Sequence, residues 1–503
     1  MARIRLGMLL LLALLAFSGC ATITNIVVDK SGKGTHTSLR QAVSDWREGM
    51  EFQIRNGVYD EQLILKSKMD IRGESRDGVV IHFTGEGPAV VGRDVSDIRI
   101  SNLRLEKNKQ GEHPVVMLTS TDVQMENCTV SGAKMAGIRA ANFGNLALRD
   151  CLIEDNEWAG IFFDERAQGS VKKTLITKNG TGIVVERFSS AIPQEQTAYR
   201  EEAGNILSVS ESTIQGNMRV GFSLRKGARI EILHNTIVDN GEIGIEVDSR
   251  SDVVIRENLI ANQKRGLVFQ LAGFGVVGGN QIKNHSIAGV VVYGPSKPEI
   301  VLNDIFENTR GLVLTDGTEA LIKDNRIRSN QKNGVEINEA SRPTLEGNWI
   351  LKNSEVGVVI LKASKPTIRK NLLVENGWYG LLAGKQAKPL VLNNTFYRNV
   401  ARGAWFTESS EGTFANNAVV GSQIGLSFFK NQDIEPKHQA NLVWGNENRD
   451  YEDVLDVPKS NISKNPLFTD PTKFDFSPQS GSPLIGEGDS YIGAIPYHPA
   501  SGS

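Results

Sequence analysis

The chain has 503 residues, of which 40% are apolar and 23% are charged, and it contains 50 glycines. This composition is typical of a folded protein and excludes an intrinsically disordered one. The formal net charge of −2 argues against nucleic acid as the main partner, because proteins that bind nucleic acid usually carry a basic excess.

Residues 1–19 are predicted to be a signal peptide. Arg3 and Arg5 precede the apolar run 6–17, which is too short to span a bilayer. The next residues, Ala16-Phe17-Ser18-Gly19-Cys20, resemble the lipobox of bacterial lipoproteins, and the resemblance implies lipid on Cys20. Ala21 rather than Asp follows the cysteine, which implies sorting to the outer membrane. We therefore expect an envelope protein anchored by lipid alone, with ordinary cleavage and release as the alternative because Phe17 stands where Leu is usual.

Residues 20–50 are predicted to form an N-terminal strand and a capping helix. The strand runs from Asn25 to Asp29. The helix is expected from Ser38 to about Trp46, because Ser38 and Gln41 have capping-box spacing and the apolar residues fall on one stripe. A short amphipathic helix in front of a β-solenoid would cover its first, otherwise exposed, coil.

Residues 51–429 are predicted to form a solenoid, because a pattern of Asn-x-Ile-x-x-Asn followed by Gly returns every 22 or 23 residues. Each repeat contains short runs in which apolar and polar residues alternate, which is typical of strands and not of helices. Three short strands per repeat describe one coil of a parallel β-helix, and we expect about fifteen coils in an all-β fold. The first Asn of the pattern occupies Asn235, Asn258, Asn280, Asn303, Asn325, Asn348, Asn371, Asn394 and Asn417, and the Gly occupies Gly244, Gly266, Gly289, Gly311, Gly334, Gly357, Gly380, Gly403 and Gly425.

The asparagines are expected to stack as a ladder, because one coil rises only about 4.8 Å above the next. An inward amide can then bond to the amides above and below it. Asn and Gly are expected at the corners because both tolerate left-handed backbone. Cys128 and Cys151 occupy the ladder position in two neighbouring early coils. We interpret them as small buried hydrophobic residues, with a vertical disulfide as the alternative.

The region from residue 25 to about residue 105 resembles the start of pectin methylesterases and other pectate-lyase-like β-helices. The resemblance rests on Val27-Val28-Asp29, Gly32 to Gly34, Thr37 to Val43, Ile54 to Glu61 and Ile71-Arg72-Gly73. It implies a right-handed, single-stranded parallel β-helix. It does not extend to the chemistry of that family, because Ser131-Gly132-Ala133-Lys134 stands where the esterases carry a Gln-Asp pair. Esterase activity is therefore not expected.

Two segments interrupt the period. Gly182 and Gly221 are 39 residues apart, which predicts an insert at about 189–204. Long polar insertions on solenoids often carry function, and they are also simply tolerated there. Residues 430–503 leave the repeat and are predicted to form a last coil and a loop-rich C-terminal cap.

Candidate functional residues lie on the strand that follows each Gly, where the second and fourth residues should point outward. Charged side chains cluster at these positions in adjacent coils. We call this group the charged patch; its members are Asp164, Glu186, Arg225, Glu246 and Asp248. If the charged patch is a catalytic site, it has two interpretations; neither requires an organic cofactor, and the first involves Ca²⁺. Asp164, Glu186 and Asp248 could hold Ca²⁺ against an acidic sugar with Arg225 as base or clamp, or two carboxylates could serve as acid and base in glycoside hydrolysis. A solvated, salt-paired strand face is the structural alternative, and it would argue against catalysis.

Two further sets of outward residues could contact a polysaccharide. Aromatic side chains on or near the same face could stack on sugar rings; they are Phe162, Tyr293, Trp378, Tyr379 and Trp405, with Trp158 at a corner. Lys297, Arg342, Lys365 and Lys388 stand at equivalent turns. These basic residues are interpreted as a device against edge association, with a cationic ladder for an acidic polysaccharide as the alternative.

Three classes of function remain. The first is an envelope-anchored protein that interacts with carbohydrate, by binding or by processing. The second is a polysaccharide lyase or glycoside hydrolase that acts on an acidic polysaccharide through the charged patch. The third is a structural or assembly protein of the periplasm, similar to β-helix accessory proteins of metal-centre maturation, which the fold permits.

Overall fold

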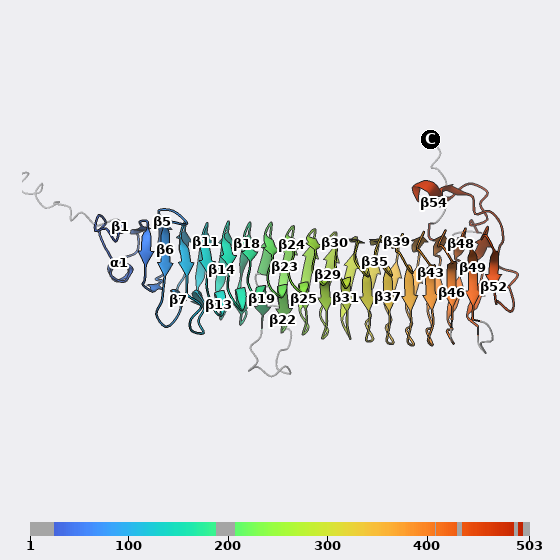
Figure 1. Cartoon of the computed structure of the whole chain (residues 1–503), viewed down its shortest axis with the longest axis horizontal. Helices are drawn as coiled ribbons and strands as arrows, with labels where there is room; N and C mark the ends of the chain where they lie inside the picture. Colours follow the sequence, from blue (N-terminus) through green and yellow to red (C-terminus); the bar gives the residue numbers. More distant parts are fainter. Residues whose placement is uncertain (1–24, 188–206, 408, 430–434, 487–490, 496–503) are drawn as a thin grey trace, which may run out of the picture.

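The computed structural model describes residues 25–187, 207–407, 409–429, 435–486 and 491–495. Cys20 and the predicted insert at about 189–204 lie outside these ranges. The described strands stack one coil upon the next along a single axis, from β1 at one end to β52 near the other (Figure 1). A fixed 22- or 23-residue period produces this shape because each coil buries its apolar side chains only when neighbours cover it.

All the described strands except the antiparallel pair β53 (Phe468–Asp470) and β54 (Asp475–Pro478) belong to three parallel sheets, and each coil after the first contributes one strand to each of these sheets. Sheet A contains 18 described strands: β1 (Asn25–Val28), β2 (Glu51–Ile54), β5 (Asp70–Gly73), β8 (Ile98–Ser101), β11 (Asp122–Glu126), β14 (Asn145–Arg149), β17 (Gln168–Lys172), β20 (Leu207–Ser210), β23 (Arg229–Leu233), β26 (Asp252–Arg256), β29 (Phe274–Gly278), β32 (Lys297–Val301), β35 (Leu321–Lys323), β38 (Thr344–Glu346), β41 (Thr367–Arg369), β44 (Leu390–Leu392), β47 (Thr413–Ala415) and β50 (Lys437–Gln439). Sheet B contains 17 described strands: β3 (Gly57–Tyr59), β6 (Val79–His82), β9 (Arg104–Glu106), β12 (Thr129–Ser131), β15 (Leu152–Glu154), β18 (Leu175–Thr177), β21 (Thr213–Gln215), β24 (Thr236–Val238), β27 (Leu259–Ala261), β30 (Gln281–Lys283), β33 (Asp304–Phe306), β36 (Arg326–Arg328), β39 (Trp349–Leu351), β42 (Leu372–Val374), β45 (Thr395–Tyr397), β48 (Ala418–Val420) and β51 (Leu442–Trp444). Sheet C also contains 17: β4 (Leu63–Ile64), β7 (Val90–Arg93), β10 (Val116–Thr119), β13 (Ala136–Ala141), β16 (Ala159–Asp164), β19 (Thr181–Glu186), β22 (Val220–Arg225), β25 (Ile243–Val247), β28 (Arg265–Phe269), β31 (Ala288–Val292), β34 (Leu312–Leu314), β37 (Val335–Ile337), β40 (Val358–Ile360), β43 (Tyr379–Ala383), β46 (Arg402–Phe406), β49 (Ile424–Phe428) and β52 (Arg449–Glu452).

The stack therefore has about 18 turns rather than the expected fifteen. The early coils account for the difference, because between β2 and β9 they lack the regular Asn and Gly positions on which the count rested. The stack also begins before residue 51 and continues past residue 429. β1 pairs in parallel with β2, and β49 pairs in parallel with β52.

The predicted asparagine ladder is confirmed. Nδ2 of Asn258 donates to Oδ1 of Asn280 at 3.0 Å, and Nδ2 of Asn280 donates to Oδ1 of Asn303 at 2.9 Å. A second ladder forms from the last Asn of the pattern, and there His285 takes the place of an asparagine and accepts from the backbone N–H of Gln263. Burial lowers the pKa of His285 to about 4, so the ring is neutral at pH 7.

The recurring glycines are required for a reason other than left-handed backbone. Left-handed φ values instead occur at the residue before each ladder asparagine, and that residue varies, for example Glu257 and Leu302. A Cβ on Gly311 would lie 2.4 Å from the carbonyl oxygen of Gly334 in the next coil. The glycines therefore allow neighbouring coils to approach closely where the chain enters sheet C.

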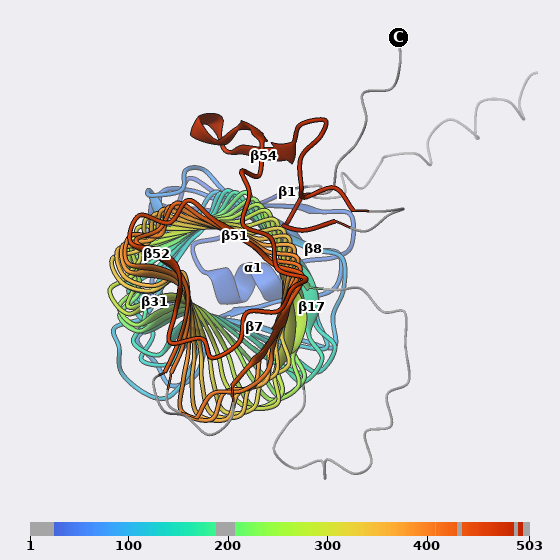
Figure 2. The same cartoon turned by 90° about the vertical axis from the view of Figure 1, so that its right-hand side faces the viewer.

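The N-terminal cap matches the prediction. Helix α1 (Leu39–Asp45) has Ser38 as its N-cap, which accepts a hydrogen bond from the backbone N–H of Gln41. Leu39, Ala42 and Val43 are buried in the main core, and the helix lies across the centre of the stack when the molecule is viewed along its axis (Figure 2). The helix thus covers the apolar end of the first coil.

The C-terminal cap has two parts. The first part extends the stack, because Ile462 bridges Leu442 in parallel and Asn461 bonds to Asn441 at the end of the first ladder. The second part contains β53 (Phe468–Asp470), the short 3-10 helix η2 (Pro471–Lys473) and β54 (Asp475–Pro478), and it folds back along the outside of the stack (Figure 1). Its apolar residues pack on outward residues of sheet B, with Phe468 and Phe476 against Tyr397. This segment therefore covers an apolar patch of the outer surface as well as following the last coil.

Cys128 and Cys151 are free, buried thiols in neighbouring coils. The hydrogen bond between the two thiols and their burial raise the pKa of Cys128 well above its ordinary value. This agrees with their interpretation as small buried residues. Among the described helices, none is both long enough and apolar enough to cross a membrane.

Candidate functional site

The charged patch lies on the outer face of sheet C, as the sequence predicted. Asp164 in β16 is in register with Glu186 in β19, which is in register with Arg225 in β22. We call a row of aligned side chains that runs from coil to coil along the axis a file, and each coil one rung of it. The backbone N–H of Asp248 bonds to the carbonyl of Leu224, which places Asp248 one rung beyond Arg225 in the same file. Glu246 lies in the adjacent file, in register with Ser223. Residues distant in sequence become neighbours because the coils stack without offset.

Two carboxylates of the patch are held in ion pairs. Nη2 of Arg139 lies 2.6 Å from Oδ2 of Asp164, and the Asp164 side chain is buried. Glu186 forms an ion pair with Nε of Arg225 at 2.6 Å and accepts a hydrogen bond from Nζ of Lys226 at 2.6 Å. Such pairing occupies the carboxylate oxygens, so Asp164 and Glu186 are poorly placed to exchange a proton with a substrate.

Glu246 and Asp248 are in a different electrostatic environment. Burial, followed by the neighbouring charge of Asp248, raises the pKa of Glu246. Burial also raises the pKa of Asp248, whose Oδ1 is buried and accepts no hydrogen bond from the part of the chain that the structure describes. Among the described residues, Glu246 accepts hydrogen bonds from two neutral groups, at 3.3 Å from Ser223 and at 3.1 Å from Gln270. The two residues therefore form an outward-facing acidic pair with acceptor capacity to spare.

The predicted calcium ligands do not converge. Asp164 and Asp248 are three rungs apart, about 14 Å at the spacing of parallel strands, whereas Ca²⁺ needs oxygen ligands at about 2.3–2.6 Å. Within the described ranges, no group of three or more His, Cys, Asp or Glu side chains is placed to hold a metal ion. The hypothesis of a site built from Asp164, Glu186 and Asp248 therefore does not fit the structure.

One continuous file of outward residues connects the acidic pair to the aromatic residues nearer the C-terminus. We call it the outer file; strand by strand, the register aligns Glu246, Val268, Val291, Val313, Glu336, Val359, Leu382 and Trp405. Val268, Val291 and Val359 are almost fully buried although they point outward. Val268 and Val291 belong to one outer cluster with Ala288, against which Tyr293 and Val313 pack. Glu336 is neutralised by Arg310 at 2.8 Å. The face is thus a largely apolar strip.

Three of the predicted aromatic residues meet at the end of this strip. We call Trp378, Tyr379 and Trp405 the aromatic cluster. The ring centroids of Tyr379 and Trp405 are 5.2 Å apart, and those of Trp378 and Tyr379 are 6.5 Å apart. The guanidinium of Arg402 lies 4.6 Å from the Trp405 ring centroid and is paired with Glu452 at 2.6 Å. Trp378 is 53% exposed, so the cluster is accessible from solvent.

The remaining predicted residues do not join this group. Phe162 is buried in a small outer cluster with Val184 and packs edge-on against Trp158, with ring centroids 4.9 Å apart. Tyr293 packs beside Val291 on the outer strip. In the basic column, Lys297 pairs with Glu319 and Lys388 pairs with Glu411, so two of its four charges are neutralised. That pairing weakens the hypothesis of a cationic ladder.

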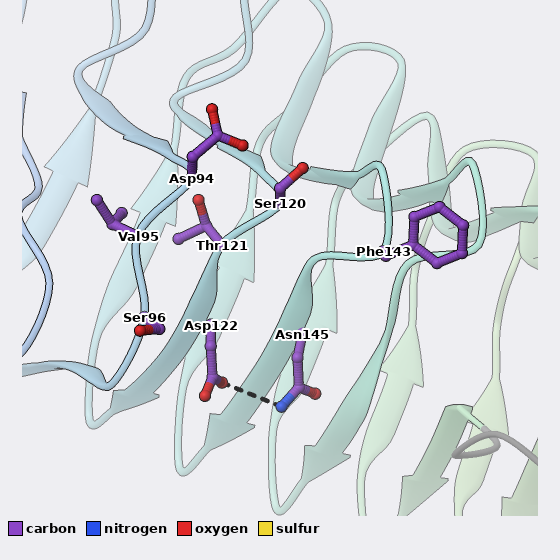
Figure 3. A pocket seen from close by; sticks show the side chains of 8 residues that line it. All are labelled: Asp94, Val95, Ser96, Ser120, Thr121, Asp122, Phe143 and Asn145. Carbon is purple, nitrogen blue, oxygen red and sulfur yellow. Dashed lines mark hydrogen bonds between the residues drawn. The ribbon is translucent and has the colours of Figure 1, made fainter.

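A hollow that sequence reasoning missed lies at the corner between sheets C and A near the N-terminal end (Figure 3). It is open to solvent, has a volume of about 300 Å³ and is lined by Asp94, Val95, Ser96, Ser120, Thr121, Asp122, Phe143 and Asn145. Oδ1 of Asp122 accepts a hydrogen bond from Asn145 at 3.0 Å, and Phe143 stands out at the rim. The sequence contained one indication of this hollow, because Phe143 is an apolar residue at a corner. The hollow could not be predicted from the repeat, because the widths of the loops that form it are not periodic.

The parallel sheets and stacked corners define the class of protein as a parallel β-helix. A family model described as "right handed beta helix region" matches residues 88–194, 194–305 and 296–449. The chain belongs to this family, and the match confirms the right-handed fold predicted from resemblance. Among curated proteins, no sequence matches this chain.

Several solved structures are similar in fold. The A-module of the mannuronan C-5 epimerase AlgE4 of Azotobacter vinelandii is 13% identical, with 82% of this chain and 90% of that chain covered and a TM-score of 0.28. The periplasmic alginate epimerase AlgG is also 13% identical, with 76% and 77% covered and a TM-score of 0.34. An N-terminal fragment of gene product 12 of bacteriophage Phi29 is 10% identical, with 80% and 84% covered and a TM-score of 0.36. At these identities and scores the similarity concerns the fold alone.

Proposed function

We propose that this protein binds a polysaccharide along the outer face of sheet C. Lipid on Cys20 would hold it in the bacterial envelope, on the outer membrane. The binding site centres on Glu246 and Asp248 and continues along the outer file. This is the first of the three functions that the sequence left open.

The observation that carries the proposal is the buried Oδ1 of Asp248, which accepts no hydrogen bond from any described residue, beside the half-buried Glu246. An acceptor left without a donor is costly, and a ligand that supplies donors relieves that cost. Sugar hydroxyls are such donors, and Gln270 and Ser223 are placed to bond to the same ligand. Further along the outer file, the partly exposed Val313 and Leu382 offer apolar surface for the C–H faces of sugar rings.

Binding is tested with the lipid-free protein and a panel of soluble neutral and acidic polysaccharides, by calorimetry. Asp248→Asn and Glu246→Gln preserve shape and remove charge, so each is expected to weaken binding about tenfold or more, since hydrogen bonds to a charged acceptor contribute about 1.5–3 kcal/mol. Asp252→Asn on the outer face of sheet A is the matched control, because Asp252 forms only a loose pair with Arg229 at 3.8 Å. Equal affinity of all three variants for every ligand that the wild type binds would refute the site.

Glycan cleavage is a second candidate, favoured by the raised pKa values of Glu246 and Asp248. A carboxyl group with a raised pKa can donate a proton to a leaving group. With Asp164 and Glu186 in ion pairs, catalysis would depend on the acidic pair alone. Release of new reducing ends or unsaturated sugars, lost in Glu246→Gln, supports this function. If the ligands are unchanged after prolonged incubation at pH 5 and pH 7, cleavage is refuted and binding alone is supported.

The lipid anchor is tested separately. Labelled fatty acid should be incorporated into the wild-type protein and not into Cys20→Ser, and the variant should leave the membrane fraction. A wild-type protein that carries no label and fractionates as soluble would refute the anchor without affecting the glycan site.

A further inference from the structure

The aromatic cluster has the form of a binding platform. Trp378 is half exposed, and its ring meets Tyr379 edge-on, as Tyr379 meets Trp405. Arg402 packs between Tyr379 and Trp405 and is fixed by Glu452, which also accepts a hydrogen bond from Ser427. The rings are therefore held in place by neighbours before any ligand arrives, and preorganisation lowers the cost of binding.

The platform and the acidic pair belong to the same file. Seven register steps lead from Glu246 to Trp405. At about 4.8 Å per step the two lie about 34 Å apart along the axis. A ligand that touches both must be a chain, because no small molecule reaches this far.

The surface between the acidic pair and the aromatic cluster has apolar and hydrogen-bonding side chains side by side, which matches the C–H faces and the hydroxyl groups of a sugar chain. The outer file is mainly valine and leucine, with Val313 and Leu382 partly exposed, and five of the next seven residues on the neighbouring file have hydrogen-bonding side chains: Gln270, Tyr293, Thr315, Asn338 and Thr407. Beside the strip, Arg310 is paired with Glu336 and Arg402 is paired with Glu452. Because these two cations are already paired and an acidic pair lies at one end of the strip, these charges do not complement a polyanion.

We infer that the aromatic cluster is a second glycan subsite, and that the ligand is a neutral polysaccharide lying along the outer file from Glu246 to Trp405. The inference rests on the proposed function and adds two properties of the ligand: it is uncharged, and it is long enough to contact both subsites. The sugar rings stack on Trp405 and Trp378, and the hydroxyl edge faces the file of Gln270 and Thr315. Two subsites on one chain act as a bivalent site, so affinity rises steeply once the ligand is long enough to reach both.

The test uses the folded, lipid-free protein and size-graded neutral oligosaccharides (linear glucans, mannans and xylans), with polygalacturonate as the acidic comparison. Trp405→Ala and Trp378→Ala are compared with Trp349→Ala, a matched control on β39 of sheet B that is 40% exposed. We expect wild-type affinity to rise with length. Trp405→Ala should lower long-chain affinity at least tenfold, and long chains should then gain little over short ones. Thermal midpoints of the variants verify folding.

The outcomes separate the two proposals. If the wild type binds no glycan, the proposed function fails and this inference fails with it. If it binds a glycan, but Trp405→Ala and Trp378→Ala bind as tightly as Trp349→Ala, only the second subsite is refuted. If polygalacturonate binds more tightly than the neutral oligosaccharides, and this binding weakens with added salt, the inference that the ligand is neutral is refuted. A dimer that Trp405→Ala converts to monomer, with glycan affinity unchanged, identifies the cluster as a contact between copies of the chain.

Discussion

Replacing Gly311 by alanine tests the close stacking that underlies the fold. The new Cβ would lie 2.4 Å from the carbonyl oxygen of Gly334, 2.8 Å from Cγ2 of Ile327 and 3.1 Å from Nδ2 of Asn330. Ordinary contact begins at 3.4 Å, so the two coils must separate by about 1 Å. The clashing carbonyl accepts the hydrogen bond from Leu312 at 2.9 Å, and separation weakens that bond.

The magnitude follows from these two effects. Overpacking costs about 1–3 kcal/mol, and a buried carbonyl left without its donor costs about 1–3 kcal/mol more. We therefore expect Gly311→Ala to lose about 2–6 kcal/mol of stability. Gly278→Ala is the matched control, because its Cβ would meet its nearest neighbour, Val301, at 3.5 Å and its φ is not left-handed.

The assay combines guanidinium unfolding with amide hydrogen exchange of β34 and β37. Gly311→Ala should unfold at a clearly lower denaturant concentration, and protection should fall first in these two strands. Gly278→Ala should match the wild type or exceed it slightly, because alanine restricts the unfolded chain. Identical midpoints for the two variants would show that the glycines are not needed for stacking, and the account of the repeat would be wrong.

Two further predictions concern the ladders. The unfolded chain protonates His285 below about pH 6.5, and the folded chain protonates it only below about pH 4, so this residue's contribution to stability is lost as the pH falls through that window, by up to about 3 kcal/mol. In His285→Asn, the difference between the unfolding midpoints at pH 7.5 and pH 5 should therefore be smaller than in the wild type. Equal pH responses of the variant and the wild type would contradict this assignment. Asn303→Ala removes donors to Val277, Val301 and Asn325 and the acceptor of Asn280, and should cost about 3–5 kcal/mol by denaturant unfolding. The exposed Asn448→Ala should change stability little, and a loss of the same size there would show that the ladder has no special role.

The sequence by itself determined the fold and much of the surface. A strict 22- or 23-residue period implies that residues one period apart touch, so the Asn258–Asn280 contact and the file of Asp164, Glu186 and Arg225 follow from counting. Helix α1 was equally readable, because a cap and an apolar stripe are local signals. The early coils were undercounted because their spacing is irregular.

The tertiary structure decided which side chains pair. Whether Asp164 is free or bound to Arg139 depends on rotamers and on the adjacent file, neither of which the period specifies. The same holds for Arg402 between two aromatic rings, and for the hollow at Asp94, which depends on loop width. The C-terminal segment could fold back on sheet B only because Tyr397 and its neighbours expose an apolar patch there. Periodicity fixes where each residue stands along the stack, whereas charge, shape and side-chain packing between files determine what it contacts.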